Sequence, residues 1–200
     1  EGYSDQLMSG VMNDFCARHP QLTIELNLAA VNDVVRQVYE GQAHIGVAYA
    51  PRLIPGITSV ASARQPLCAV VHPQHPLTRL LQPLALDEVL KWPLGLASHG
   101  YGIRQLIDAV EVMSKRHFRP SLVSNSLATL KQYVSSGNGV TFIGHVALLH
   151  EIRRQQLVAL KIDHPVFAEA ETHVIVRQHR PLSPAAKQLL TEITHLWPFD

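Results

Sequence analysis

Residues 123–130 read VSNSLATL, and residues 134–140 read VSSGNGV. The order is that of a strand end, a polar turn, an amphipathic helix, a glycine stop and a new strand. Three short polar side chains, Ser124, Asn125 and Ser126, therefore lie at a predicted strand-to-helix junction. In an open α/β sheet this junction is where a small ligand binds. Because no catalytic motif accompanies them, the stretch favours a sensor of small molecules over an enzyme.

The composition is typical of a soluble globular chain with almost no net charge. The 200 residues are 46% hydrophobic, and 17 Lys and Arg balance 16 Asp and Glu. A surface that binds nucleic-acid phosphates is normally basic, so we do not expect this chain to touch DNA itself. No signal peptide precedes the fold and no apolar run approaches the ~18 residues of a membrane span, which predicts a cytoplasmic protein with no membrane contact. Cys16 and Cys68 lie in apolar runs and are predicted to be buried free thiols.

The hydrophobic periodicity predicts alternating helices and strands, which is typical of βαβ units and a parallel sheet. Asn32 and Ser183 are expected to cap helices. Helices are predicted at residues 5–18, 32–40, 86–91, 103–110, 127–134, 146–154 and 184–196. Strands are predicted at residues 22–28, 45–48, 66–72, 94–97, 120–124, 140–143 and 172–178.

These elements divide into two α/β lobes. We expect lobe I at residues 1–64 plus 163–200 and lobe II at residues 65–162, so that two crossover strands join them. Lobes connected in this way can hinge around a ligand. The first helix has no strand ahead of it, whereas a parallel lobe of this type needs one. We therefore expect the first strand to be missing and the natural protein to begin earlier.

Six motifs resemble, in their order and spacing, the effector-binding domain of LysR-type transcriptional regulators. They are FCARHP (15–20), VYEGQAHIGV (38–47), HPL (75–77), SNSL (124–127), VSSGNGV (134–140) and RPLSP (180–184). The resemblance implies a type 2 periplasmic-binding-protein fold, with an effector held between the lobes. It also implies a homodimer or homotetramer, and DNA binding only through an upstream winged helix-turn-helix domain absent from this chain. Two positions depart from the family pattern: His44 replaces a frequent aspartate, and Gly144–His145 replaces the usual Leu-Pro.

In lobe II, the three polar residues of the junction can bind an effector at a helix N-terminus, where free N–H groups favour an anion. The alternative is that Ser126 only caps its helix and Asn125 only braces the turn. The glycines of the 98–102 loop allow close backbone approach, and His99 and Tyr101 add an imidazole and an aromatic hydroxyl. A solvated surface histidine is the alternative for His99. Arg104 can balance a carboxylate, although an arginine in a first helical turn is usually solvated.

In lobe I, the resemblance places the loop of Tyr3, Ser4 and Asp5 at the cleft. Ser4 or Asp5 can instead be a plain helix cap, and Asn32 is either a cap or a further contact. The replacement at His145 is expected to alter the pocket. The predicted effector contacts are Tyr3, Ser4, Asn32, His99, Gly100, Tyr101, Ser124, Asn125, Ser126 and His145.

Metal and catalytic chemistry find little support. The 12 histidines lack the convergent spacing of a metal site, so neither a metal nor a cofactor is expected. No nucleophile elbow, phosphate loop or dinucleotide fingerprint occurs, so no catalytic residue is assigned. The expected function is an effector-sensing regulatory domain. Its alternatives are a transport-associated solute-binding protein, which a secretory signal would favour, and an enzyme on the same fold, which turnover of the bound ligand would reveal.

Overall fold

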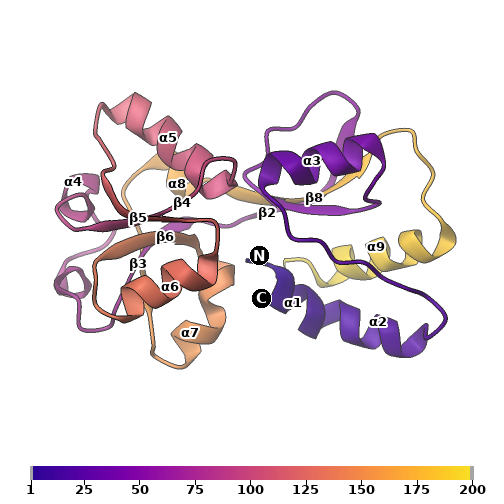
Figure 1. The fold of residues 1–200 in the computed structure, drawn as a ribbon, viewed down its shortest axis with the longest axis horizontal. Helices are drawn as coiled ribbons and strands as arrows, with labels where there is room; N and C mark the ends of the chain where they lie inside the picture. Colours follow the sequence, from indigo (N-terminus) through magenta and orange to yellow (C-terminus); the bar gives the residue numbers. More distant parts are fainter. Residues whose placement is uncertain (1, 199–200) are drawn as a thin grey trace. The chain divides into compact units, whose positions relative to one another are not determined.

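The computed structural model describes residues 2–198, which divide into two compact units (Figure 1). Unit 1 contains Tyr3–Ala63 and the chain from Thr172 onward, and unit 2 contains Arg64–Glu171. Between residues 3 and 198 the chain passes from one unit to the other twice, at 63/64 and at 171/172. The two connections are neighbouring strands, described below.

Unit 2 is built on a five-stranded sheet of order β5-β4-β6-β3-β7. β4 pairs in parallel with β5 and β6, whereas β3 pairs antiparallel with β6 and β7. The expectation of a parallel sheet is therefore wrong for β3. The reason is that β3 enters directly from unit 1 rather than through a helical crossover. The strands are β3 (Leu67–Val71), β4 (Leu94–Ala97), β5 (Pro120–Ser124), β6 (Val140–Gly144) and β7 (Val158–Leu160).

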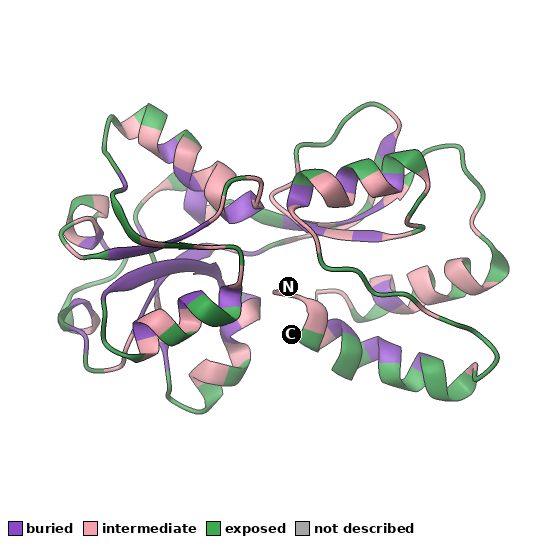
Figure 2. Cartoon of the chain, in the orientation of Figure 1, coloured by how far each residue is buried: buried purple, intermediate pink, exposed green. Residues whose placement is uncertain are grey.

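Helices cover both faces of this sheet, with α6 on one face and α5 and α8 on the other (Figure 1). The central strands β3, β4 and β6 are buried along their whole length, as strands covered on both sides must be (Figure 2). The helical elements of unit 2 are η2 (Pro76–Arg79), α4 (Leu86–Val89), α5 (Gly102–Ser114), α6 (Leu127–Ser135), η3 (His145–Leu148), α7 (Leu149–Arg153) and α8 (Pro165–Ala168).

Two glycines set how closely the elements of unit 2 approach one another. A Cβ atom at Gly95, in β4, would lie 2.9 Å from Cδ1 of Tyr133 in α6. Gly139 precedes β6 with a φ of +126°, and a Cβ atom there would lie 2.2 Å from the carbonyl oxygen of Pro93. These glycines allow α6 to pack against β4 and allow β6 to begin beside the residue that precedes β4.

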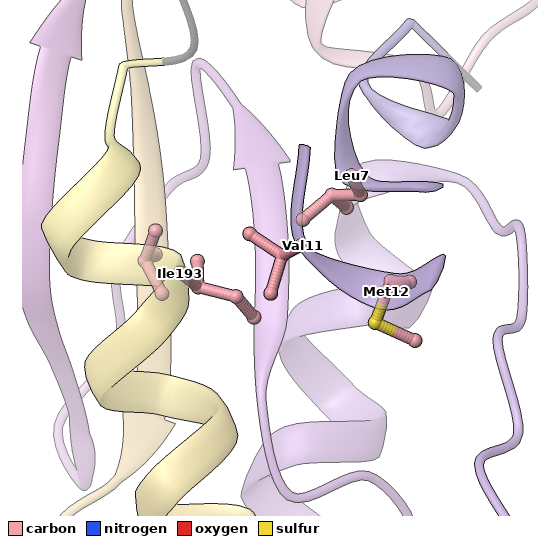
Figure 3. Packing of buried hydrophobic residues seen from close by; sticks show 5 residues of the cluster. Leu7, Val11, Met12 and Ile193 are labelled. Carbon is pink, nitrogen blue, oxygen red and sulfur yellow. The ribbon is translucent and has the colours of Figure 1, made fainter. Parts of the chain in front are cut away.

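Unit 1 has a three-stranded sheet of order β1-β8-β2, in which β1 and β8 are antiparallel. One face carries α3 over an apolar cluster that includes Val38, Ile57 and Ile175. A second cluster joins the N-terminal helical segment to α9, and Figure 3 shows Val11 and Ile193 within it. The elements are α1 (Ser4–Leu7), η1 (Met8–Met12), α2 (Asn13–Arg18), α3 (Val31–Glu40), β1 (Gly46–Tyr49), β2 (Ile57–Arg64), β8 (Glu171–Arg177) and α9 (Pro184–Leu196).

The N-terminal helical segment contains a π-helical turn, η1, between α1 and α2. Its buried stripe passes through Leu7, Val11 and Phe15, which leaves Cys16 exposed. The prediction of a buried Cys16 is therefore wrong, because Phe15 takes the inward position. The prediction for Cys68 is confirmed, since it is buried in β3 and burial raises its pKa to about 11.

The strand predicted at residues 22–28 does not form. Residues 21–30 have no regular secondary structure, and within the described chain Leu22 is their only backbone N–H donor in a hydrogen bond. A strand needs a neighbour with which its backbone can pair, and among residues 2–198 β1 pairs only with β8. As a result Leu26 and Leu28 stay exposed. Across residues 2–198, no helix is both long and apolar enough to cross a bilayer.

Candidate functional site

The carboxyl ends of β4, β5 and β6 lie along one edge of the unit 2 sheet, because these strands are parallel and adjacent. Ala97 ends β4 opposite Ser124 of β5, and the N–H of Ser98 donates to the carbonyl of Ser124 at 2.9 Å. β6 ends at the residue before His145. The structure thus brings the 98–101 loop, the 124–126 turn and His145 to the edge where open α/β sheets bind ligands.

Two helices begin at this edge, α5 with 13 residues and α6 with 9. Their first N–H groups have no acceptor within the helix and carry the positive end of the helix dipole. Ser126 Oγ accepts the N–H of Thr129 at 3.3 Å, which confirms the predicted cap of α6. α5 follows Tyr101 without a side-chain cap in the described chain. The electrostatics of this edge therefore favour an anionic group.

The turn at residues 124–126 is stabilised by a hydrogen bond between two of its own residues. Ser124 Oγ accepts the N–H of Ser126 at 3.1 Å, so Ser124 stabilises the turn, and not Asn125 as the alternative interpretation had it. Asn125 is exposed, and within residues 2–198 its amide makes no hydrogen bond. Its two donors and its carbonyl oxygen can thus all serve a ligand.

The 98–101 loop lies beside an ion pair on α5. Gly100 has a φ of +91°, a conformation that favours glycine. Arg104 Nε donates to Asp108 Oδ1 at 2.7 Å, and the Arg104 side chain is only 12% exposed. The alternative of a solvated arginine is therefore wrong, because Asp108, one turn later, holds the guanidinium along the helix. His99 remains a surface residue whose Nδ1 lies 3.6 Å from Asp108 Oδ2.

A second ion pair, which the sequence analysis did not identify, anchors α6. Lys131 Nζ lies 2.8 Å from Glu151 Oε1 of α7, and the side chains are 20% and 19% exposed. The pair joins a helix that precedes β6 to a helix that follows it. Two opposite charges 20 residues apart carry no local sequence signal, so only the fold reveals the pair.

The candidates from the first predicted lobe, Tyr3, Ser4 and Asn32, all lie in unit 1. Tyr3 is the N-cap residue of α1 and makes no side-chain cap, so neither Ser4 nor Asp5 is the cap. Asn32 is not a cap either, because α3 begins one residue earlier, after Ala30. The Tyr3 ring stacks on Trp197 with a centroid distance of 5.5 Å. That these residues contact an effector stays a prediction.

His145 is exposed at the first position of η3. Among the side chains of residues 2–198, no group of three or more His, Cys, Asp or Glu is arranged to hold a metal ion. The polar groups at the sheet edge are therefore hydrogen-bond donors and acceptors. The nearby charge of Arg104 is balanced by Asp108.

Two curated relatives are bacterial transcriptional regulators of the helix-turn-helix type. The chain is 26% identical to CbbR of Cereibacter sphaeroides over 179 residues, which are 88% of this chain and 57% of that protein. It is 25% identical to BbuR of Bordetella bronchiseptica over 142 residues, which are 71% of this chain and 43% of that protein. The chain thus spans about half the length of these relatives.

Solved structures share the fold. The effector binding domain of QuiR in complex with shikimate matches with a TM-score of 0.78 and 15% identity, over 98% of this chain and 92% of that one. The CcmR regulatory domain of Synechocystis PCC6803 in complex with 2-PG matches with a TM-score of 0.82 and 15% identity, over 96% and 92%. At these identities the likeness concerns the fold, which is that of LysR effector-binding domains and type 2 periplasmic binding proteins. Residues 1–197 match the LysR substrate binding domain family, and the chain belongs to that family.

Proposed function

We propose that this chain is the effector-sensing regulatory domain of a LysR-type transcriptional regulator. The observation that carries the proposal is the gathering of the 98–101 loop, the 124–126 turn and His145 at the carboxyl edge of β4, β5 and β6. Transcriptional regulators among the relatives favour this function over that of a transport-associated solute-binding protein. Transcriptional regulators are also not a class of enzymes, which supports the proposal that this chain binds its effector without converting it.

The proposed effector is a small molecule with an anionic group such as a carboxylate. It binds at the carboxyl edge of β4, β5 and β6 in unit 2. Support comes from the N-terminus of α5, which has no side-chain cap in the described chain, and from the exposed Asn125 amide. Arg104 is already balanced by Asp108, so the helix ends and amide rather than a bare cation attract the anion. QuiR with shikimate and CcmR with 2-PG show that neighbours of this fold bind small molecules.

Binding is proposed to act by population shift. An effector that prefers one arrangement of the lobes increases the fraction of molecules in that arrangement, in proportion to its differential affinity. The change is transmitted to a winged helix-turn-helix domain outside residues 1–200, in a cytoplasmic homodimer or homotetramer. A chain with a formal net charge of +1 suits this role, because DNA contact is left to the other domain.

Calorimetric titration with a panel of small carboxylates, including shikimate and 2-PG, tests the function. A ligand that binds the wild-type chain is then titrated into the double variant Asn125→Ala/Ser126→Ala. We expect an affinity loss larger than the about 1 kcal/mol of a lost cap. The matched control is Ser135→Ala/Ser136→Ala, at the opposite end of α6, where both hydroxyls donate to the Gln132 carbonyl. Equal affinity of the two double variants, with both folded, would remove the turn from the site.

A further inference from the structure

The two connections between the units form one ribbon of paired chain. β2 (Ile57–Arg64) crosses the boundary at 63/64, and β8 (Glu171–Arg177) crosses it at 171/172. The two strands are neighbours in the unit 1 sheet, and in unit 2 the N–H of Gln65 donates to the carbonyl of Ala170 at 2.7 Å. Any reorientation of one unit against the other must therefore bend or twist this ribbon.

A side-chain hydrogen bond links the two strands of the ribbon within unit 1. Ser59 Oγ of β2 lies 2.9 Å from His173 Nδ1 of β8, and both residues are half-buried. Ser59 Oγ also lies 3.2 Å from the carbonyl oxygen of Ala61. Because a carbonyl can only accept, the Ser59 hydroxyl forms both hydrogen bonds when it donates to Ala61 and accepts from His173. This arrangement requires the His173 tautomer that carries its proton on Nδ1.

The linked position lies between two residues of β2 that pack against different apolar clusters. Side chains two residues apart in a strand share a face, so Ile57, Ser59 and Ala61 should all point the same way. Yet Ile57 belongs to the cluster under α3, whereas Ala61 packs against the cluster of Leu7, Val11 and Ile193 on the other side of the sheet. Ser59 therefore lies between the residue of β2 that packs under α3 and the residue that packs against the N-terminal cluster.

We propose that the Ser59–His173 hydrogen bond is a lock that sets the range of orientations available to the two units. The lock holds β2 in one register against β8, close to both crossing points. Backbone pairing alone repeats along a ribbon and tolerates twisting, whereas a side-chain bond at one position does not. Loss of a single hydrogen bond that only one of two conformations contains changes their ratio by about fivefold.

The distance between two spin labels, measured by double electron–electron resonance without ligand, tests the lock. The exposed Cys16 provides one label site in unit 1, and Val112→Cys, at a side chain 78% exposed on α5, provides the other in unit 2. Cys68 is buried with a pKa of about 11 and stays unlabelled. Ser59→Ala and His173→Gln remove the bond. Ser59→Thr keeps the acceptor, and His173→Asn keeps a donor at the place of Nδ1.

We expect Ser59→Ala and His173→Gln each to change, by about fivefold, the ratio of molecules at the main wild-type distance to molecules at other distances. Ser59→Thr, His173→Asn and the matched control Ser62→Ala, an exposed serine on the same strand, should keep the wild-type distribution. The double variant Ser59→Ala/His173→Gln should add nothing to either single change.

Identical distributions for Ser59→Ala and Ser62→Ala would overturn the lock, as would additive effects in the double variant. If Ser59→Ala does not fold, the comparison of His173→Asn with His173→Gln decides alone, with thermal melting as the check on folding. The experiment uses no effector, so its outcome is independent of the proposed ligand site.

Discussion

The two units differ in how completely their sheets are paired and covered. In unit 2, three adjacent strands are buried from end to end, and α5, α6 and α8 cover both faces. In unit 1, β1 and β2 alternate between buried and more accessible residues, and β1 has a neighbour only on the side of β8. Residues 21–30, with the alternation of a strand, stay irregular. The number of available backbone partners, rather than the alternation of side chains, decides which extended segment becomes a strand.

The largest effect that we expect from this contrast is a difference in amide hydrogen exchange between the two units. Amides of Ala69 and Val70, in the centre of a sheet, exchange only when unit 2 opens, whereas amides of residues 24–28 have no hydrogen-bond acceptor in the described chain. We expect exchange rates that differ by about a thousandfold or more. The measurement is amide exchange by NMR. Similar protection of the two segments would mean that residues 21–30 are paired in solution.

Next in size is the effect of a methyl group at Gly139. Gly139→Ala forces a Cβ atom against the Pro93 carbonyl, and we expect a loss of about 3 kcal/mol in the free energy of unfolding of unit 2. Gly137→Ala is the matched control, because its φ is +79° but nothing lies within 4 Å of the new atom. That variant should lose about 1 kcal/mol. Urea unfolding followed by circular dichroism measures both, and equal losses would refute the contact.

Each unit also contains one serine-capped helix, which allows a matched pair of variants. Ser126 Oγ accepts the Thr129 N–H at 3.3 Å in unit 2, and Ser183 Oγ accepts the Ala186 N–H at 3.2 Å in unit 1. Replacement of either serine by alanine should cost about 1 kcal/mol of stability in thermal melting. Only Ser126→Ala should also weaken effector binding. An equal effect of Ser183→Ala on binding would mean that the caps act through stability alone.

The smallest effects are expected from a surface ion pair in each unit. Hydrogen bonds from Arg18 hold the pKa of Glu192 below its usual value in unit 1, and those from Arg116 do the same for the pKa of Asp87 in unit 2. A depressed folded-state pKa stabilises the fold above the unfolded value, about 4.3 for Glu and 3.9 for Asp. That stability is lost as the pH falls through the folded-state pKa.

Glu192→Gln and Asp87→Asn should therefore lower the melting temperature slightly at neutral pH. The difference from the wild type should shrink below about pH 4. Melting temperatures measured between neutral and acidic pH check both variants. A difference that is constant over this range would show that neither pair contributes through its charge.

Prediction from sequence worked best for elements that a local pattern of residues marks. β4 and β5 lie at the predicted residues, and Ser126 and Ser183 cap their helices as expected. β2 was not predicted, because its small residues give little contrast in hydrophobicity between the two faces of the strand. β7 and α8 were missed because they are only 3 and 4 residues long.

The candidate site likewise contains features that a local pattern predicts and contacts that only the fold reveals. The polar turn at residues 124–126 could be placed at a sheet edge because a glycine-bounded helix follows it. The pairing of Lys131 with Glu151 and the link between Ser59 and His173 depend on neighbours distant in the chain, which no local pattern encodes. Helix starts at Ser4 and Asn32 were misjudged by one or two residues, and that shift alone removes their role as caps.

The two tryptophans of the chain are divided between the units, so each unit carries its own fluorophore. Trp197 stacks on the Tyr3 ring in unit 1, and Trp92 meets the buried His75 ring edge-on at a centroid distance of 4.4 Å in unit 2. Trp92→Phe leaves emission from unit 1 alone, and Trp197→Phe leaves emission from unit 2 alone. A pair of single-tryptophan variants can therefore report the unfolding of each unit separately, without an added dye.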